Sequence, residues 1–242
     1  MSKVWLITGS SRGLGRAFEK ATLAAGDQVV ATARNPAQLV DLKNRYGDSV
    51  QTPALDVTNE MQARDALHTA IETHGRLDVL VNNAAFQEHV LDFEDLTEEH
   101  FDRTLKTNLY GYFHMAKAAV PHMKEGSAIV MTGSVTGLLG NKNLLDYSMT
   151  KGGIHAFVRS LATHLIDKGI RVNAVAPGPV WTPLNPADRP AKGVSKFGSE
   201  TPMKRPAQPE EIAPAFVFLA APSCSSYITG EILPIIGGYL GG

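Results

Sequence analysis

The sequence predicts a doubly wound α/β (Rossmann) fold, in which helices flank both faces of one parallel sheet of about seven strands. Short segments rich in β-branched residues alternate with longer segments of helical periodicity along the whole chain. This alternation is typical of βαβ units. Most of the short segments are continuously apolar, as expected for parallel strands that are covered on both faces. Right-handed crossovers then favour the doubly wound topology.

The predicted elements follow one another without a repeat or a linker, so we expect a single domain over residues 1–242. The expected strands are residues 4–8, 28–33, 50–55, 77–82, 127–132, 171–176 and 231–235. The expected helices are residues 13–25, 37–46, 60–73, 97–123, 147–168 and 209–219. The segment 177–209 is rich in Pro and Gly and has no sustained periodicity. Long irregular segments in compact domains are usually binding loops, and we expect a substrate loop at about 178–208.

Composition excludes several classes of protein. The net charge is −1, which favours neither nucleic acid nor an anionic membrane as a partner. No apolar run is long enough to cross a bilayer and the N-terminus does not resemble a signal peptide, so we expect a cytoplasmic protein. The single cysteine, Cys224, excludes an internal disulfide, and the eight histidines form no HExxH pair. We therefore expect no metal.

The first predicted strand runs directly into the glycine-rich sequence TGSSRGLG, and a helical pattern follows at once. Gly9 can adopt the tight turn, while Gly13 and Gly15 lack the Cβ that would obstruct a pyrophosphate or the contact between helix and strand. The free N–H groups and the positive dipole end of the helix then hold phosphates. This context predicts a dinucleotide site.

The residues after the second predicted strand indicate which nucleotide binds. In dinucleotide folds, an acidic residue about 20 positions after the glycines binds the ribose 2′-OH of NAD. Residues 31–35 of this chain read ATARN and contain no carboxylate. Arg34 can instead pair with a 2′-phosphate, and Arg12 can add a second positive charge. We expect NADP(H), with NAD(H) as the alternative.

Tyr147 and Lys151 carry the predicted chemistry. Their i, i+4 spacing places both on one face of a helix. A nearby ammonium favours a phenolate, so we expect Lys151 to lower the pKa of Tyr147 towards the range where proton transfer is efficient. Ser134 follows the fifth predicted strand, at the sheet edge where ligands of open α/β sheets bind.

The TGxxxGxG spacing and the order of Asn108, Ser134, Tyr147 and Lys151 resemble the short-chain dehydrogenase/reductase family, and the resemblance covers essentially the whole chain. It implies that Ser134 hydrogen-bonds the substrate oxygen and that Tyr147 transfers its proton. It also implies that Lys151 binds the nicotinamide ribose, that Asn108 holds a proton-relay water and that the protein is a homotetramer. The implied cofactor-binding residues are Gly9, Ser11, Arg12, Gly13, Leu14, Gly15, Arg34, Asp56, Val57, Asn83, Ala84, Tyr147, Lys151, Pro177, Gly178, Val180 and Thr182.

The expected activity is hydride transfer between NADPH and a ketone, in the manner of a carbonyl reductase or secondary alcohol dehydrogenase. Apolar residues on segments that border the site favour a hydrophobic or aryl ketone over a sugar: Leu138, Leu139, Leu144, Leu145, Trp181, Leu184 and Phe197. The alternatives are a glucose-type sugar dehydrogenase, a 3-oxoacyl reductase of the same family, and a non-catalytic NADP-binding regulator or scaffold.

From Asn82 onward the chain resembles a bacterial branch of the family with NNAA and WTPL sequences, some members of which are called glucose dehydrogenases. The opening strands resemble other branches. A mixed ancestry, or engineering, is the hypothesis that follows from this difference.

Overall fold

The structure, a computed structural model, describes residues 2–185 and 191–238, with the side chains of residues 191 and 192 left out. Its centre is a seven-stranded sheet in the order β3-β2-β1-β4-β5-β6-β7, and every neighbouring pair is parallel. The strands are β1 (Val4–Ile7), β2 (Gln28–Ala31), β3 (Val50–Gln51), β4 (Leu77–Asn82), β5 (Met123–Thr132), β6 (Arg171–Pro177) and β7 (Ile232–Ile235). The predicted doubly wound fold is confirmed.

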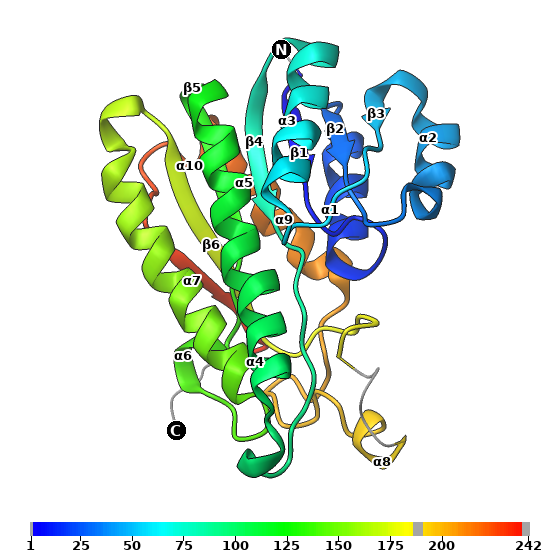
Figure 1. The fold of residues 1–242 in the computed structure, drawn as a ribbon, viewed down its shortest axis with the longest axis vertical. Coiled ribbons are helices and arrows are strands. Elements are labelled where there is room, and N and C mark those ends of the chain that lie inside the picture. Colours follow the sequence, from blue (N-terminus) through cyan, green and yellow to red (C-terminus); the bar gives the residue numbers. More distant parts are fainter. Residues whose placement is uncertain (1, 186–190, 239–242) are drawn as a thin grey trace.

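Helices cover both faces of this sheet (Figure 1). On one face lie α3 (Glu60–His74), α5 (Gly111–Ala119) and α7 (Leu145–His164), and on the other lie α1 (Gly13–Ala24), α2 (Val40–Tyr46) and α9 (Pro209–Ala220). Successive strand residues point to opposite faces. Leu6 of β1 therefore joins the core under α3, α5 and α7, whereas its neighbour Trp5 joins the core under α1 and α9. The second core includes the rings of Phe18 and Phe216, whose centroids are 3.9 Å apart.

The strand order reverses between β1 and β4. From β1 the chain builds outward through β2 to β3, and from β4 it builds the other way through β5 and β6 to β7. In open α/β sheets a reversal of this kind opens a crevice at the carboxyl ends of the strands, and ligands bind there. The turn from β1 into α1 lies at this crevice, so the fold brings the predicted cofactor turn to the expected place.

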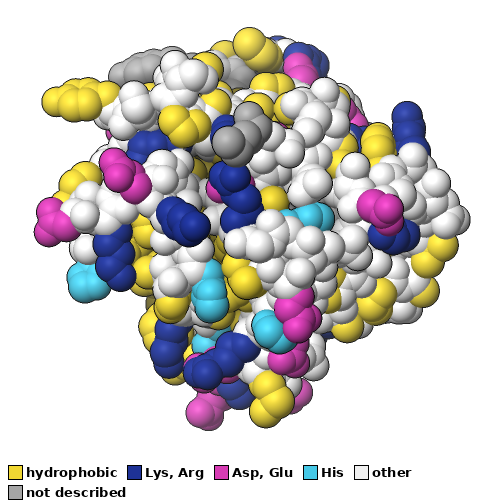
Figure 2. All heavy atoms as spheres, turned by 90° about the horizontal axis from the view of Figure 1, so that it is seen from above, with side chains coloured by type: hydrophobic (Ala, Val, Ile, Leu, Met, Phe, Trp, Pro, Cys, Tyr) yellow, Lys and Arg dark blue, Asp and Glu magenta, His cyan; other side chains and the backbone are white. Residues whose placement is uncertain are grey.

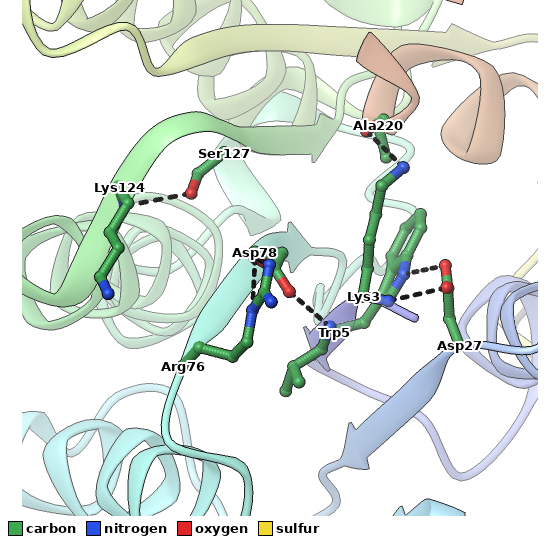
Figure 3. Close-up of polar contacts among 9 residues, drawn as sticks. Lys3, Trp5, Asp27, Arg76, Asp78, Lys124, Ser127 and Ala220 are labelled. Atoms are coloured by element: carbon green, nitrogen blue, oxygen red, sulfur yellow. Dashed lines mark hydrogen bonds and ion pairs between the residues drawn. The ribbon is translucent and has the colours of Figure 1, made fainter. Parts of the chain in front are cut away.

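Polar contacts hold the opposite edge of the sheet together (Figure 3). The Asp27 carboxylate accepts hydrogen bonds from the backbone N of Lys3 and from Nε1 of Trp5, each at 2.8 Å. Asp78 accepts from Nε of Arg76 at 2.9 Å. Viewed from this end, basic side chains lie among acidic ones and histidines (Figure 2). The contacts of this edge stabilise the ends of the strands, away from the crevice.

Residues 98–122 are helical without a break, which agrees with the helix expected over residues 97–123, but the helix is not α-helical throughout. The structure has α4 (Glu98–Leu105), a π-helical turn (Lys106–Tyr110), α5 and a 3₁₀ turn (Val120–His122). Pro121 has no N–H to continue a helix, and β5 begins at Met123. The apolar pattern of β5 begins only at Ser127, after three exposed residues, which explains why the sequence suggests a later start.

The remaining elements lie within a few residues of their predicted positions. The helix expected at 147–168 is observed as α7 followed by a 3₁₀ turn over Ile166–Lys168. The strands expected at 28–33 and 50–55 are shorter, although an isolated bridge between Ala33 and Ala54 extends their pairing. The helix expected at 37–46 begins as a 3₁₀ turn, and three short helices lie where the sequence predicts none: α6 (Thr136–Leu139), α8 (Ala191–Val194) and α10 (Pro222–Ser225).

Among the helices of residues 2–185 and 191–238, none is both long and apolar enough to cross a bilayer. The same residues contain no group of three or more His, Cys, Asp or Glu side chains placed to hold a metal ion. The expectation that the protein needs no metal stays a prediction.

Candidate active site

The turn between β1 and α1 requires its glycines. Gly9 and Gly13 have φ angles of +69° and +59°, in the left-handed region that side chains disfavour. A Cβ added to Gly15 would lie 2.2 Å from the carbonyl oxygen of Gly9. A Cβ added to Gly9 would lie 2.9 Å from Cα of Ala84, at the end of β4. The turn therefore packs against itself and against the neighbouring strand end with no room for side chains.

The first turn of α1 fits the phosphates of a dinucleotide. It contains no acidic residue, and Arg12 at the N-cap makes no capping hydrogen bond. Within the part of the chain that the structure describes, no side chain therefore caps the first N–H groups or neutralises the positive end of the helix dipole. Arg12 and Arg34 are exposed, and neither forms a hydrogen bond or ion pair with the residues that the structure describes. Ser11 and Leu14 lie in the same turn and are half-buried.

Asn83 ties three strand ends together beside this turn. Its Nδ2 donates to the carbonyl oxygen of Thr8 at 3.0 Å, and its Oδ1 accepts from Oγ1 of Thr132 at 3.2 Å. The backbone N atoms of Asn83 and Ala84 both donate to Oγ1 of Thr8, at 2.8 and 3.0 Å. The residues predicted to contact the cofactor after β4 thus fix the crevice between β1, β4 and β5.

Asp56 and Val57 lie in the loop that leads into α3, and their local contacts are defined. Oδ1 of Asp56 accepts from the backbone N and Oγ1 of Thr58, at 3.0 and 2.8 Å. The side chain of Asn59, not Asp56, caps α3. A Cβ added to Gly111 would lie 2.8 Å from Cγ2 of Val57, so Val57 packs directly against α5.

The segment after β6 reaches the glycine-rich turn from far along the chain. Pro177 pairs with Ile235 in the sheet, and Gly178 continues this contact with an N–H···O bond of 2.8 Å to the same residue. Val180 is buried. A Cβ added to Gly13 would lie 3.3 Å from Cβ of Thr182, so Thr182 lies against the turn.

Ser134, Tyr147 and Lys151 come together beside the end of β5. Their exposed fractions are 7%, 8% and 0%. Ser134 hydrogen-bonds the phenol of Tyr147. The Nζ atom of Lys151 lies 5.3 Å from the centroid of the Tyr147 ring. Three side chains that the sequence singles out therefore form one buried cluster at the crevice.

Burial controls the proton affinities of this cluster. It raises the pKa of Tyr147 to about 12, although the hydrogen bond from Ser134 acts in the opposite direction. It lowers the pKa of Lys151 to about 7. The Tyr147 pKa is therefore raised in this structure and not lowered as expected, because the loss of hydration disfavours the charged form of the phenol.

Two further side chains orient Ser134. Its Oγ accepts from the backbone N of Thr136 at 3.1 Å, and Oγ1 of Thr136 lies 3.0 Å away on the same side. The backbone N of Ser134 donates to Nε2 of His155 at 3.4 Å. Burial lowers the pKa of His155 to about 4, so the imidazole is neutral and can accept this bond. The hydroxyl proton of Ser134 is then left for Tyr147 or for a substrate oxygen.

Asn108 is fully buried in the π-helical turn and uses both ends of its amide. Its Oδ1 accepts from the backbone N of Phe86 at 2.8 Å, and its Nδ2 donates to the carbonyl oxygen of Phe86 and to Oγ1 of Thr150, each at 3.0 Å. Thr150 in turn donates to the carbonyl oxygen of Tyr147 at 2.8 Å. Asn108 therefore clamps the loop after β4 to the catalytic helix.

Tyr112 lies outside the motifs that the sequence singles out, yet it contacts Lys151. Nζ of Lys151 donates to the carbonyl oxygen of Thr132 at 2.6 Å and to the phenol oxygen of Tyr112 at 3.5 Å. Tyr112 follows Asn108 by four residues, and His155 follows Lys151 by four. The i, i+4 relation to a motif residue is the signal by which sequence reasoning could have found both.

The apolar residues expected to line a substrate pocket divide into separate groups. The rings of Trp181 and Phe197 contact each other in a tilted arrangement, with centroids 6.0 Å apart and an interplanar angle of 49°. They border a cavity of about 630 Å³ lined by Trp181, Val194, Ser195, Phe197, Ser199, Lys204, Arg205 and Pro206. Leu144 is buried in the core, and Leu184 is half-buried. In contrast, Leu138, Leu139 and Leu145 are exposed. Residues 186–190 of the expected substrate loop lie outside the described residues.

Comparison with known proteins finds related chains over nearly the whole length of this one. A family model described as enoyl-(acyl carrier protein) reductase matches residues 9–240. Over 248 aligned residues the chain is 44% identical to glucose and ribitol dehydrogenase homolog 2 of Arabidopsis thaliana, with 98% of this chain and 86% of that protein covered. The chain belongs to the short-chain dehydrogenase/reductase family. As a short-chain dehydrogenase/reductase, it is an oxidoreductase that binds a nicotinamide nucleotide.

Two other short-chain dehydrogenases/reductases differ in the nucleotide that their names print. The chain is 43% identical to the chloroplastic NADPH-dependent aldehyde reductase 1 of Arabidopsis thaliana, over 98% of this chain and 85% of that protein. The 3-ketoacyl-(acyl-carrier-protein) reductase from Brucella melitensis, solved in complex with NADH, superposes with a TM-score of 0.89 and 31% identity. That alignment covers 98% of this chain and 97% of the other.

Proposed function

We propose that the protein is an NADPH-dependent carbonyl reductase and secondary alcohol dehydrogenase with Tyr147 as its general acid and base. The observation that carries this proposal is the buried cluster of Ser134, Tyr147 and Lys151 beside the glycine-rich turn. With a pKa of about 12, the phenol of Tyr147 is protonated at neutral pH. It can therefore donate a proton to a carbonyl oxygen, which suits the direction of reduction.

Each residue of the cluster has a distinct task in this proposal. A bound nicotinamide nucleotide supplies the hydride to the carbonyl carbon, or accepts it in the reverse direction. Tyr147 gives its proton to the carbonyl oxygen in reduction and takes it from the alcohol in oxidation. Ser134 donates to the same oxygen, because Thr136 already occupies its acceptor side. Lys151 supports the negative charge that forms on Tyr147 and holds the nicotinamide ribose.

In this proposal the side chain of Asn108 does not hold the proton-relay water. Both ends of the Asn108 amide are engaged with Phe86 and Thr150. A π-helical turn interrupts the regular i to i−4 backbone ladder. The backbone of this turn, rather than the Asn108 side chain, is then the part that would hold a water.

The preference for NADP(H) rests on Arg34 and Arg12. Both guanidinium groups are exposed and make no polar contact with the described residues, and residues 31–35 contain no acid. A bidentate arginine matches the geometry of a phosphate. One relative is named as NADPH-dependent and one neighbouring structure contains NADH, so NAD(H) is the alternative cofactor.

A hydrophobic or aryl ketone is the proposed substrate class. Trp181 and Phe197 supply apolar surface to the cavity of about 630 Å³, whose lining also includes Ser195, Ser199, Lys204 and Arg205. A sugar needs more polar partners than an aryl ketone. A sugar dehydrogenase is the second candidate, because the relative at 44% identity is named a glucose and ribitol dehydrogenase homolog. We also propose a homotetramer, since Tyr110, Phe113 and Met149 are exposed near or on α5 and α7, and we propose a cytoplasmic location.

The proposal is tested by following NADPH and NADH oxidation side by side across aryl ketones, β-ketoesters, diketones and quinones. The reverse reaction is followed with glucose and simple secondary alcohols. Turnover of apolar ketones with NADPH above NADH supports the proposal. Preferential oxidation of glucose would favour the sugar dehydrogenase, and nucleotide binding without turnover of any compound would favour a scaffold.

A further inference from the structure

Lys151 has few polar partners for its charge. The residue is fully buried, and burial lowers the pKa of its ammonium to about 7. Among the described residues, its Nζ donates to two acceptors, the carbonyl oxygen of Thr132 at 2.6 Å and the phenol oxygen of Tyr112 at 3.5 Å. Each acceptor favours the charged form of a buried amine. The charge of Lys151 therefore depends on Tyr112 as well as on β5.

Tyr112 is fixed so that its oxygen faces this ammonium. Its hydroxyl donates to the carbonyl oxygen of Thr132 at 3.1 Å, which leaves the lone pairs of the phenol oxygen to accept. Its own carbonyl oxygen accepts from Nδ2 of Asn82 at 3.1 Å, so the backbone is tied to β4. Nζ of Lys151 lies 5.4 Å from the centroid of the Tyr112 ring and 5.3 Å from that of Tyr147, between two phenols.

We propose that Tyr112 is a positioning residue for Lys151: its phenol oxygen holds the ammonium, in its charged form, next to Tyr147. This inference rests on the proposed function, in which the charge of Lys151 supports the Tyr147 phenolate. Tyr112 acts through Lys151 and does not itself exchange a proton with the substrate.

The groups around Lys151 allow the effect of Tyr112 on the charge of Lys151 to be measured separately. Burial raises the pKa of Tyr112 well above 10, so it remains a neutral acceptor across the range of an assay. The titratable side chains that face Lys151 are Tyr112 from α5, and Tyr147 and His155 from α7. His155 is neutral above its pKa of about 4, and the groups that Thr132 of β5 and Ser134 of the following loop contribute to this cluster are uncharged.

Tyr112→Phe is the direct test, because it removes the acceptor oxygen and keeps the buried ring. Without this acceptor the ammonium of Lys151 loses its proton more easily, and the Tyr147 phenolate is supported less. We expect the rising limb of the pH profile of alcohol oxidation to move to higher pH by about 0.5–1 unit. Turnover at pH 7 then falls by about 3- to 10-fold and approaches that of the wild type at high pH, while the Kd for NADPH changes by less than about 2-fold.

The matched control is Tyr227→Phe. Tyr227 is fully exposed and makes no contact with Lys151 in the structure, so the loss of its hydroxyl should leave the pH profile unchanged. If the rising limb of the pH profile is unchanged in Tyr112→Phe, the inference is overturned, even if the melting temperature of the variant falls. A purely structural role would lower the stability of the protein without shifting its pH profile. If Tyr112→Phe does not fold, Tyr112→Met replaces it, and the same shift is required.

Tyr147→Phe is assayed in parallel to separate this inference from the proposed function. If Tyr147→Phe keeps its turnover, the proposed function fails, and this inference fails with it. If Tyr147→Phe is inactive and Tyr112→Phe shows the wild-type profile, the inference alone is overturned. An inactive Tyr147→Phe protein together with a shifted Tyr112→Phe profile supports both.

Discussion

The charged groups in the two halves of the crevice differ in their exposure to solvent. On the phosphate side, Arg12 and Arg34 are exposed and make no polar contact with the described residues. On the catalytic side, Lys151 and Tyr147 are buried, and burial moves the pKa of each away from its ordinary value. The phosphate side thus offers hydrated charge to a ligand, whereas the catalytic side uses desolvation to set proton affinity. Mutations should therefore change affinity on one side and chemistry or stability on the other.

Tyr147→Phe should have the largest effect. It removes the hydroxyl that transfers the proton, and general acid–base catalysis contributes roughly 10²- to 10⁴-fold. We expect turnover to fall by about 10³-fold while the Kd for NADPH changes by less than about 3-fold, because the glycine-rich turn is untouched. Steady-state rates and a fluorescence titration with NADPH measure the two quantities. Retained turnover would remove Tyr147 from the mechanism.

Lys151→Met should lower activity by roughly 100-fold and at the same time stabilise the protein. Burial lowers the pKa of Lys151 from 10.5 to about 7. Between these values the unfolded chain binds the extra proton, so wild-type stability rises with pH across the window, and the cost of the buried charge is greatest below pH 7. The gain from methionine is at most about 5 kcal/mol, because one pKa unit is worth about 1.4 kcal/mol.

Thermal unfolding at pH 6 and pH 9 tests this prediction. The advantage of Lys151→Met should be larger at pH 6 than at pH 9, since the wild-type amine is largely neutral at the higher pH. An equal advantage at both values, or a less stable variant, would contradict the assigned cost of burial.

Local motifs were sufficient to locate the site but not to describe its electrostatics. The glycine-rich turn, Ser134 and the pair of Tyr147 and Lys151 could be predicted because short sequence patterns and the strand edge determine their positions. The pKa shifts could not be predicted from the sequence, because they arise where α5 and β5 pack against α7. These contacts join residues that are far apart in sequence. The raised pKa of Tyr147 is the clearest consequence of that tertiary burial.

The π-helical turn was missed for a related reason. The segment from α4 to α5 has a continuous helical pattern, and one extra residue in a turn leaves almost no trace in that pattern. The buried amide of Asn108, with its bonds to Phe86 and Thr150, occupies this turn. π-Helical turns are frequent at functional sites. The position of Asn108, a candidate site residue, within a long helical pattern was therefore the available signal for such a turn.

Arg34→Ala should affect affinity alone. A charge-assisted hydrogen bond contributes about 1.5–3 kcal/mol, so the Kd for NADPH should rise by roughly 10- to 100-fold. The Kd for NADH, which has no 2′-phosphate, should change by less than about 2-fold. Because Arg34 is exposed, the loss should be smaller at high ionic strength. Titrations of both nucleotides at two salt concentrations measure this.

Arg45→Ala is the matched control for Arg34→Ala. Arg45 lies near the end of α2, away from the glycine-rich turn, and its guanidinium stacks on Tyr46. Its removal should leave both nucleotide affinities unchanged. An equal loss of NADPH and NADH affinity in Arg34→Ala would separate Arg34 from the 2′-phosphate.

Glu19 differs from the exposed arginines of the phosphate side, because its side chain is buried. Its side chain is fully buried in α1, its carboxyl oxygens have no hydrogen-bond partner among the described residues, and the nearest cation is Arg16 at 3.8 Å. Burial raises its pKa from 4.5 to about 8. The folded protein therefore keeps a proton that the unfolded chain releases between these values, and wild-type stability falls as pH rises through this window.

Glu19→Gln should thus stabilise the protein by an amount that grows from pH 5 to pH 8. At pH 7 we expect a net gain of about 1–2 kcal/mol, because the buried amide still loses hydration that offsets part of the benefit. This corresponds to a rise in Tm of roughly 2–8 °C for a chain of this size. Tm values at pH 5 and pH 8 measure the effect. An advantage that does not grow with pH would show that Glu19 is already ionised, and that Arg16 compensates its charge inside α1.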